Sequence, residues 1–372
     1  SVLANDTDAD GNALTVTGVT QGTRGALVTI RNGNVIRYVP PFAFTGTDTF
    51  VYTIANGHGR TAMATVTVTV SPRPPSQTGF TFTTVEVPGA GGTQLRGIND
   101  LGQMVGASGV NSFGWPTDGF VTADGITFER HRFPGQPGTQ FTGISQDGRI
   151  VGVFCCNDER GFSFDRATAS FHDLSFTSVL FGVNASGHVV GGDGSNQGFF
   201  SVDGGWSREN VDYPGTSRVT TASGLNDNDV IVGYYRDGSG RYHGFRKAGV
   251  TFSQFDAPGA VSTIPLGINN LNQIVGYFTT PSGEAHGFLL DCGIFTQIDV
   301  PGSVSTSVSG INNLGTVVGY FEDAHGVQRG FITTAHATVT ISIGNVTKAE
   351  GNGGITNFDF PVTLSSASTV PV

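Results

Sequence analysis

One ten-residue segment occurs six times between residues 97 and 319, and this repeat limits the possible folds more than any other feature. The copies are GINDLGQMVG at 97–106, GISQDGRIVG at 143–152, GVNASGHVVG at 182–191, GLNDNDVIVG at 224–233, GINNLNQIVG at 267–276 and GINNLGTVVG at 310–319. Self-similarity at a spacing of about 40 residues is typical of repeat architectures, in which each period is one supersecondary unit.

Each copy has the pattern of strand, tight turn and strand. Its sixth position is always Gly, Asp or Asn, the residue types that best tolerate a positive φ. A short hairpin loop needs one such residue, commonly in a bulged turn. The two residues before the last Gly are always apolar, which favours a strand buried on both faces. The last Gly itself fits a close approach of two backbones.

Two further markers share this period. Gly-Phe recurs once in each of the six periods, and a Pro-Gly turn recurs in five of them, at 88–89, 134–135, 214–215, 258–259 and 301–302. The third copy lacks the Pro-Gly turn, near 174–175. Each period therefore holds about four strands, for example 252–256, 264–268, 273–277 and 287–290, which is the size of a propeller blade.

We therefore predict an all-β chain in which residues 80–334 form a six-bladed β-propeller. If the blades are offset by one strand, 81–87 completes the last blade and closes the ring. A β-solenoid is the competing architecture, although its coils are usually shorter and do not carry four turn signals each.

The flanking segments are also rich in β-strand signals. Residues 1–70 contain the strictly alternating ATVTVTV at 64–70 and three X-Gly turns, which predicts a small antiparallel β-sandwich. Residues 71–79 contain three prolines and form a semi-rigid linker. In the tail, 335–372, apolar residues alternate in two stretches, and two strands cannot form an independent core.

Three resemblances accompany this division. The stretches VLANDTDADG at 2–11, FTGTDTF at 44–50 and NGHG at 56–59 resemble a bacterial cadherin-like, Ig-type tandem module. The HGF motifs at 243–245 and 286–288 resemble bacterial extracellular repeats named for a His-Ala-Phe motif. The tail, with TISIG at 340–344 and KAEGNGG at 348–354, is similar to the opening of a Calx-β module.

These resemblances imply an extracellular or cell-surface bacterial protein, often adhesive. Relative to both terminal families the flanking modules are incomplete: residues 1–70 lack opening strands, and the tail lacks the strands that would follow. Either the missing strands belong to a longer chain, or the tail of one copy completes the N-terminal module of the next, which would give a head-to-tail filament. In a filament the contacts would use Val339, Ile341 and Ile343, or Phe358, Phe360 and Val362.

Calcium is the one cofactor that the sequence suggests. Asp6, Asp8 and Asp10 alternate before Gly11, as in the first half of a calcium loop. The bidentate acid expected at the twelfth position is replaced by Thr17, so the segment is not an EF-hand. A solvated acidic turn is the alternative interpretation.

The three cysteines do not make a disulfide scaffold. Cys155 and Cys156 are adjacent in an expected loop of the second blade, and they are either unpaired thiols or a strained vicinal disulfide. Cys292 belongs to the fifth period, on the opposite side of the predicted ring, and is expected to pair with neither.

Composition excludes several functions. The net charge of -10 argues against a nucleic-acid surface, and no apolar run is long enough to span a membrane. No nucleophile elbow, zinc signature or phosphate loop is present, and Glu284, Glu322 and Asp323 have the pattern of solvated loop charges.

We therefore predict a non-enzymatic structural or adhesive protein of the bacterial surface or matrix. A glycan-binding propeller of a large adhesin is the alternative, and a propeller hydrolase or lyase is less favoured. The residues that suggest sugar binding are Trp115, Tyr235, Tyr242, Phe278 and Phe321, although three of them lie where strand packing is expected.

Overall fold

The computed structural model describes residue 3 and residues 6–31, 34–41, 44–70, 80–109, 115–155, 159–193, 197–205, 207–215 and 219–333, with the strands at 341–343 and 362–364. All regular elements in these residues are β-strands. The chain divides into two compact units, one of Ser1–Pro74 with Ala337–Val372 and one of Pro75–His336. Each unit is described by itself.

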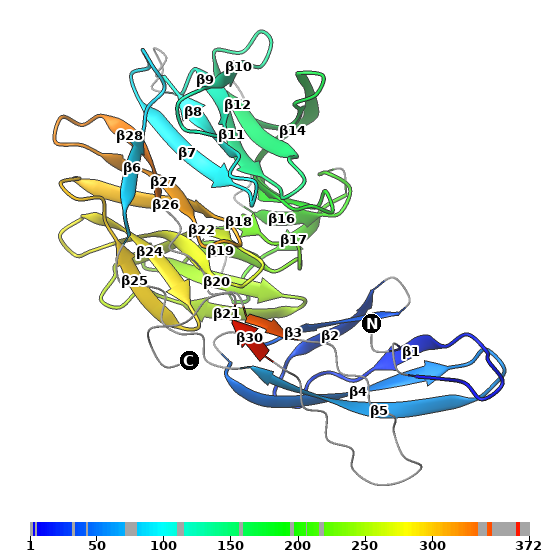
Figure 1. Ribbon diagram of the computed structural model, residues 1–372. Coiled ribbons are helices and arrows are strands. Elements are labelled where there is room, and N and C mark those ends of the chain that lie inside the picture. The colour runs from blue at the N-terminus through cyan, green and yellow to red at the C-terminus, as the bar shows by residue number, and fades with distance from the viewer. Residues whose placement is uncertain are drawn as a thin grey trace. The chain divides into compact units, whose positions relative to one another are not determined.

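The larger unit is a six-bladed β-propeller, as predicted (Figure 1). Each blade is an antiparallel meander of four strands, numbered from the channel outward. Blade 1 is β7 (Thr93–Ile98), β8 (Met104–Ser108), β9 (Asp118–Thr122) and β10 (Glu129–His131); blade 2 is β11 (Gly138–Ile144), β12 (Ile150–Cys155), β13 (Arg160–Asp165) and the first part of β14 (Ser170–Val183).

The other blades follow the same order. Blade 3 is the second part of β14, β15 (Val189–Asp193), β16 (Gly198–Ser201) and β17 (Glu209–Val211); blade 4 is β18 (Thr220–Leu225), β19 (Ile231–Arg236), β20 (Tyr242–Ala248) and β21 (Thr251–Phe255). Blade 5 is β22 (Ser262–Ile268), β23 (Ile274–Thr279), β24 (Ala285–Asp291) and β25 (Ile294–Ile298); blade 6 is β26 (Ser305–Ile311), β27 (Val317–Glu322), β28 (Gln328–Thr333) and β6 (Phe82–Val85).

Blade 6 closes the ring with strands from both ends of the array. Strand β6 pairs antiparallel with β28, from Thr333↔Phe82 to Gly330↔Val85. This confirms the offset that the sequence suggested, in which the segment at 81–87 completes the last blade.

Blades 2 and 3 share one strand. Strand β14 runs without interruption from the outer edge of blade 2 to the inner edge of blade 3, which joins the two blades into a seven-stranded sheet. The five other connections between blades contain a Pro-Gly turn whose Gly has φ between 73° and 81°. The missing Pro-Gly near residue 174 therefore corresponds to a continuous strand.

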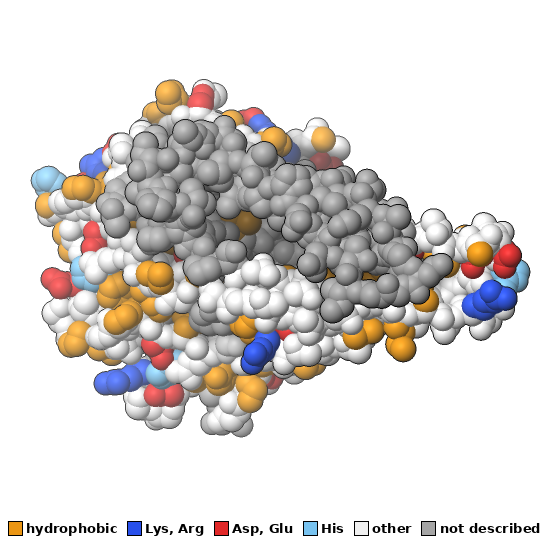
Figure 2. Space-filling model, turned by 60° about the horizontal axis from the view of Figure 1, so that its bottom comes forward, with side chains coloured by type: hydrophobic (Ala, Val, Ile, Leu, Met, Phe, Trp, Pro, Cys, Tyr) orange, Lys and Arg blue, Asp and Glu red, His pale blue; other side chains and the backbone are white. Residues whose placement is uncertain are grey.

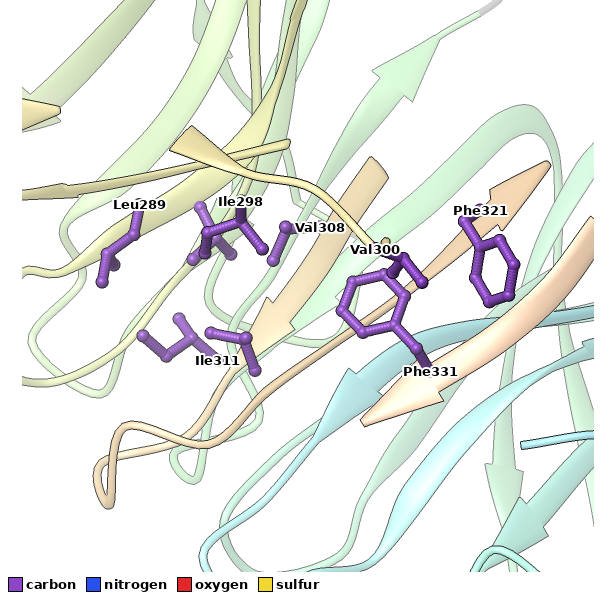
Figure 3. Close-up of a cluster of buried hydrophobic side chains, with 9 residues drawn as sticks. Leu289, Ile298, Val300, Val308, Ile311, Phe321 and Phe331 are labelled. Atoms are coloured by element: carbon purple, nitrogen blue, oxygen red, sulfur yellow. The ribbon is translucent and has the colours of Figure 1, made fainter. Parts of the chain in front are cut away.

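Apolar side chains fill the spaces between neighbouring blades. Figure 3 shows one such cluster, in which Leu289 and Ile298 of blade 5 lie near Val308 and Ile311 of blade 6. The Phe of every Gly-Phe pair is at most 2% exposed, and its ring lies against the last Gly of the repeat in its own blade. A Cβ added at Gly276, for example, would lie 2.9 Å from the ring of Phe288 and would overlap the carbonyl oxygen of Ile264.

The N-terminal module has two sheets. A three-stranded sheet has the order β1 (Thr15–Val19), β4 (Gly46–Ala55) and β5 (Thr61–Val70), and a two-stranded sheet contains β2 (Leu27–Arg31) and β3 (Val35–Val39). Their buried side chains include Val28, Val39, Phe50 and Tyr52. In the tail, β29 (Ile341–Ile343) pairs antiparallel with β30 (Val362–Leu364).

We expect Gly276→Ala to lower the free energy of unfolding of the propeller by about 2–3 kcal/mol, because the added methyl group has no room. Gly238→Ala is the matched control, since nothing lies within 4 Å of its Cβ position, and it should change stability by less than about 0.5 kcal/mol. Thermal denaturation of the two variants measures the difference. Equal stability of the two would show that the repeat glycines are not required by packing.

Candidate functional site

The centre of the ring is filled mainly by backbone. Each inner strand has a β-bulge followed by the first Gly of the repeat, and these six glycines lie around the axis. Neighbouring glycines are close: a Cβ on Gly224 would lie 3.2 Å from the Cα of Gly267, and one on Gly310 would lie 3.1 Å from the Cα of Gly97. The remaining cavity has about 70 Å³, and Arg96 is the one charged residue in its lining.

A ladder of asparagine side chains joins the blades on one face of the ring. The third residue of the repeat is a buried Asn in five blades, Asn99, Asn184, Asn226, Asn269 and Asn312. Each Oδ1 accepts hydrogen bonds from the backbone N–H groups two and four residues later, as in Asn226 with Asn228 and Val230. Each Nδ2 donates to a backbone carbonyl of the next blade.

The ladder continues across the closure of the ring. Asn269 donates to the carbonyl of Asn312 at 2.9 Å, and Asn312 donates to that of Asn99 at 3.1 Å. We call the face that carries these turns the ladder face. In the antiparallel meander it also carries the turns between the third and fourth strands. The sixth residue of every repeat has φ between 52° and 88° in these turns, which confirms the prediction from residue types.

The ladder is interrupted between blades 2 and 3. Ser145 replaces the asparagine, and its hydroxyl binds Asp147 of its own turn. A hollow of about 1060 Å³ opens around the top of blade 2. Its lining includes Ser163 of β13 and His172 of β14, which are paired across the two strands. The equivalent pair in blade 5 is Leu289 and Thr296.

The residues of this hollow do not form a nucleophilic triad. The structure gives no hydrogen bond between Ser163 and His172, although both lie in the described part of the chain. The pKa of the nearby Asp165 carboxylate is held below the usual range mainly by a hydrogen bond from the Thr168 side chain and further by the backbone N–H groups of Ala167 and Thr168. Asp165 therefore stabilises its own turn.

The opposite face carries charged pairs in five blades. The residue before Gly-Phe on the third strand meets an oppositely charged residue on or just after the fourth. The pairs are His243 with Asp256 and His286 with Asp299, each at about 3 Å, Arg329 with Glu86, Arg160 with Asp173, and in reverse polarity Asp118 with Arg132. The His of the HGF motif therefore occupies the position of Arg160 and Arg329 in other blades, and its ring nitrogen contacts a carboxylate of the fourth strand or the residue after it.

Two histidines have shifted pKa values of opposite sign. Burial lowers the pKa of His243, but hydrogen bonds to Asp256 and Asp237 outweigh it and raise the pKa overall. Burial lowers the pKa of His131, whose ring packs in tilted contacts against Phe141 and Phe164, with centroid distances of 6.0 and 4.6 Å. The Nε2 atom of His131 is buried and has no hydrogen-bond partner in the described residues.

The three aspartates of the candidate calcium loop are not gathered into a metal-binding group among the described residues. Asp8 accepts hydrogen bonds from the backbone of Asp10, from Asn12 and from Asn56, and the Asn56 contact contributes most to lowering its pKa. Asp6 accepts one from the hydroxyl of Tyr52 at 3.1 Å. Calcium binding stays a prediction.

The cysteines lie in blades 2 and 5. Cys155 is disulfide-bonded and is the last residue of β12, not a loop residue as expected from the sequence. Cys292 is an exposed thiol in the turn after β24. Cys156 lies outside the described residues, so the vicinal disulfide stays a prediction.

Most of the other predicted residues serve the blades. Tyr235, Phe278 and Phe321 are strand residues at most 9% exposed, whereas Trp115 and Tyr242 are half-buried. The predicted loop carboxylates lie between second and third strands: Glu284 in a turn, Glu322 as the last residue of β27, and Asp323 with backbone N–H groups and Arg329 as partners.

The residues predicted for polymer contacts are partly described. Ile343 pairs with Val362, and Ile341 with Leu364, in the two-stranded sheet of the tail. Val339, Phe358 and Phe360 lie outside the described residues. The asparagine ladder and the charged pairs were not predicted from the sequence, although the Asn at the third repeat position and the acidic, basic or His residue before Gly-Phe in five periods were visible signals.

Comparison with known families supports the fold type of the N-terminal module. Residues 1–69 match the family model described as Bacterial Ig domain. No curated protein matches the chain. The resemblances of the repeats to His-Ala-Phe repeats and of the tail to Calx-β stay predictions.

Several solved structures resemble the chain in fold. A structural genomics protein of unknown function from Bacteroides thetaiotaomicron is 10% identical, with a TM-score of 0.42 over 88% of this chain and 92% of that one. YCF48 bound to D1 peptide is 12% identical (TM-score 0.39, 72% and 97% covered), and TolB from Acinetobacter baumannii is 13% identical (0.41, 78% and 60%). At these identities the likeness concerns the fold alone.

Figure 2 shows acidic and basic side chains scattered among hydrophobic and other ones on the face that it draws. No helix in the described residues is long and apolar enough to cross a membrane.

We expect Ser145→Asn to stabilise the propeller by about 1 kcal/mol, because the amide can then donate to blade 3 as the other ladder residues do. Asn226→Ala should destabilise it by about 2–3 kcal/mol, since the N–H groups of Asn228 and Val230 lose their acceptor and the carbonyl of Asn269 loses one of its two donors. Denaturant titration of both variants tests the ladder. A stabilising effect of Asn226→Ala would contradict its importance.

We expect His131→Phe to reduce the loss of stability on acidification. The folded pKa of His131 lies below the unfolded value of about 6.5, so the unfolded chain binds more protons and stability falls as the pH drops below that value. His243→Gln is the matched comparison. The folded pKa of His243 is raised, so its stabilisation is complete below about pH 6.5 and is lost as the pH rises through the folded pKa.

Melting temperatures at pH 5 and pH 8 distinguish these two effects. The change in melting temperature relative to the unmodified protein should be most positive at pH 5 for His131→Phe and most negative at pH 5 for His243→Gln. Parallel pH profiles of all three proteins would show that neither histidine contributes as described.

Proposed function

We propose that this chain is a non-enzymatic structural or adhesive component of the bacterial cell surface or matrix, in which the propeller acts as a rigid scaffold. The proposal is carried by the small size and the lining of the cavity at the centre of the ring. A propeller that performs chemistry there needs a cavity with converging acids, bases or nucleophiles. Here the space of about 70 Å³ is lined mainly by glycine, aliphatic and hydroxyl residues.

The polar groups of the ring support the same role. The ladder asparagines and the charged pairs each have partners within the ring, and such satisfied networks fix one arrangement of a fold. The match of residues 1–69 to bacterial Ig domains fits a location at the cell surface.

We further propose that copies of the chain join through the edge of the N-terminal module. Strand β5 has ten residues, and among the described strands it pairs with β4 alone. Val66 and Val68 lie opposite Phe50 and Asp48, on the inner face of the sheet, but are only half-buried. An added strand with alternating apolar residues would cover this face and pair with the open edge.

The tail supplies segments of that type. Ile341 and Ile343 alternate with polar residues, as do Phe358, Phe360 and Val362. Because donor and acceptor lie in different parts of the chain, the contact is heterologous, and repeated contacts of this kind produce a filament unless the rotation closes them into a ring.

The strand-exchange proposal predicts that the full chain forms filaments and that removal of residues 335–372 abolishes them, as seen by negative-stain electron microscopy. Val66→Asp with Val68→Asp should have the same effect, because charges on the inner face oppose strand addition. Thr65→Asp with Thr67→Asp is the control, since these side chains are exposed on the other face. Filaments that persist without the tail, or a full chain without filaments, would refute strand exchange while leaving the scaffold role untouched.

A further inference from the structure

The central cavity of the ring contains a positive charge without a counter-ion. Among the residues that line it, Arg96 alone is charged. Its guanidinium donates to the side-chain oxygen of Gln94 at 2.6 Å and lies 5.0 Å from the centre of the Tyr320 ring, and both of these partners are neutral. No carboxylate of the described chain forms an ion pair with Arg96, and its Nε atom is buried without a hydrogen-bond partner there. Because a buried charge without a partner is costly, this arrangement favours an anion in the cavity.

Two buried hydroxyl groups beside Arg96 also lack partners. Ser309 of blade 6 lines the same cavity, and Ser307 pairs with Tyr320 across β26 and β27. The two serines are 6% and 8% exposed, and neither Oγ has a hydrogen-bond partner in the part of the chain that the structure describes. A Cβ added at Gly310 would lie 3.2 Å from the carbonyl oxygen of Arg96, so Ser309 and Arg96 belong to closely packed segments of blades 6 and 1. Buried hydroxyl groups normally have partners, and a bound ligand would supply them here.

The equivalent hydroxyl groups elsewhere in the ring are bonded to protein. Ser309 is the bulged residue of its inner strand, and Thr142 and Ser223 occupy the same position in blades 2 and 4. Thr142 donates to the carbonyl of Leu180 in blade 3 at 2.7 Å, and Ser223 donates to that of Pro265 in blade 5 at 2.6 Å. Ser309 makes no such bond to blade 1. Hydrogen-bonding capacity is therefore left over at the boundary that also carries the unpaired charge.

The polar end of the cavity faces away from the ladder face. Each inner strand runs toward the ladder turns, so the aliphatic residue after the first Gly of the repeat lies nearer to the ladder. Arg96 and Ser309 precede that Gly and lie farther from the ladder. The chain enters the ring at Phe82 and leaves it at Thr333, both at the ladder-face ends of their strands. The end of the channel on the opposite face is therefore the approach to Arg96.

Three tyrosines lie at this end of the channel. The residue after the last Gly of the repeat is Tyr234, Tyr277 and Tyr320 in blades 4, 5 and 6, and a small or aliphatic residue in blades 1, 2 and 3. The three tyrosines are half-buried and pair with inner-strand residues that precede the bulge. Burial, with smaller contributions from Tyr320 and Tyr234, raises the pKa of Tyr277 to about 12, so its hydroxyl stays protonated and can donate at neutral pH. Tyrosines combine an apolar ring with a polar tip, which suits the C–H groups and hydroxyls of a sugar ring.

We propose that this end of the channel binds an acidic sugar. The carboxylate enters the cavity, where it accepts hydrogen bonds from Arg96 Nε and from the hydroxyls of Ser309 and Ser307, and the sugar ring stays among the tyrosines. The cavity of about 70 Å³ is far smaller than the roughly 300–1,000 Å³ typical of ligand pockets, so it holds the carboxylate group and not the whole sugar. The proposal rests on the adhesive role proposed above and gives that role a class of ligand, namely glycans that carry carboxylates.

The negative charges of this face already have partners. The carboxylates of the charged pairs lie on or just after the third and fourth strands of their blades, each with an Arg or His partner. Exposed charges that lie farther away than a Debye length of about 8 Å are largely screened at physiological salt. At contact distance the unpaired guanidinium therefore decides the sign of the interaction, although the chain as a whole is acidic.

Isothermal titration of the full chain with sodium glucuronate tests the proposal, with glucose and sodium acetate as separate arms. Glucuronate should bind with a dissociation constant about tenfold lower than that of either glucose or acetate. Arg96→Gln should raise the dissociation constant for glucuronate by about tenfold or more, and Ser309→Ala should raise it by about threefold. Ser223→Ala is the matched control, because that hydroxyl already donates to the carbonyl of Pro265, and the affinity should not change.

Thermal melting with and without saturating glucuronate provides a second readout and shows that each variant folds. A ligand of the folded state raises the melting temperature, so glucuronate should raise it for the unmodified protein and for Ser223→Ala but not for Arg96→Gln. Absence of saturable glucuronate binding, or equal affinity of the Arg96→Gln variant, would overturn the proposal.

The two other arms identify the wrong ligand class. Glucose that binds as tightly as glucuronate would overturn the proposal in favour of a neutral-sugar site, and acetate that binds as tightly would overturn it in favour of a small-anion site without contacts to a sugar ring. These outcomes are distinct from a failure of the scaffold role, because filament formation and stability of the chain are measured without any sugar.

Discussion

The propeller depends on hydrogen bonds that buried asparagine side chains make from one blade to the next. An asparagine can bridge two blades because its carbonyl oxygen accepts from its own turn while its amide donates to the neighbour. Asn269 uses both ends in this way, and Asn312 extends the same pattern across the point where the ring closes. Since a buried amide without partners is costly, this arrangement favours the native spacing of the blades over alternatives.

The glycine positions follow from the same spacing. Because the ladder draws the inner turns together, the strands just beneath them approach so closely that a side chain at Gly224 or Gly310 would meet the neighbouring backbone. The last glycine of each repeat has a different cause, since the ring of the Gly-Phe phenylalanine occupies the space beside it. Two glycines nine residues apart are thus required by two separate contacts, one between blades and one within a blade.

Much of the fold could be predicted from the sequence because its determinants are local and repeated. The turn residues at positions such as Asp229 and Asn272 predicted the hairpins, and the missing Pro-Gly near residue 174 marked the place where β14 runs on without a turn. The site features were harder to predict, because they depend on which side chains from different blades meet. The pairing of Arg329 with Glu86 joins residues 243 positions apart, and no local pattern reveals it. The substitution at Ser145 was visible in the sequence, but the nearby hollow is lined by residues of blades 1, 2 and 3, which only the folded ring brings together.

The closure of the ring by β6 and β28 has a mechanical consequence. The chain enters blade 6 at Phe82 and leaves it at Thr333, and these two residues are paired with each other at the same end of the two strands. A tensile force transmitted between the two connections therefore acts across one pair at a time, in the manner of a zipper, and not along the strands in shear. Such a geometry yields at low force and releases blade 6 first, so under tension the closure strands would separate before the other five blades bear any load.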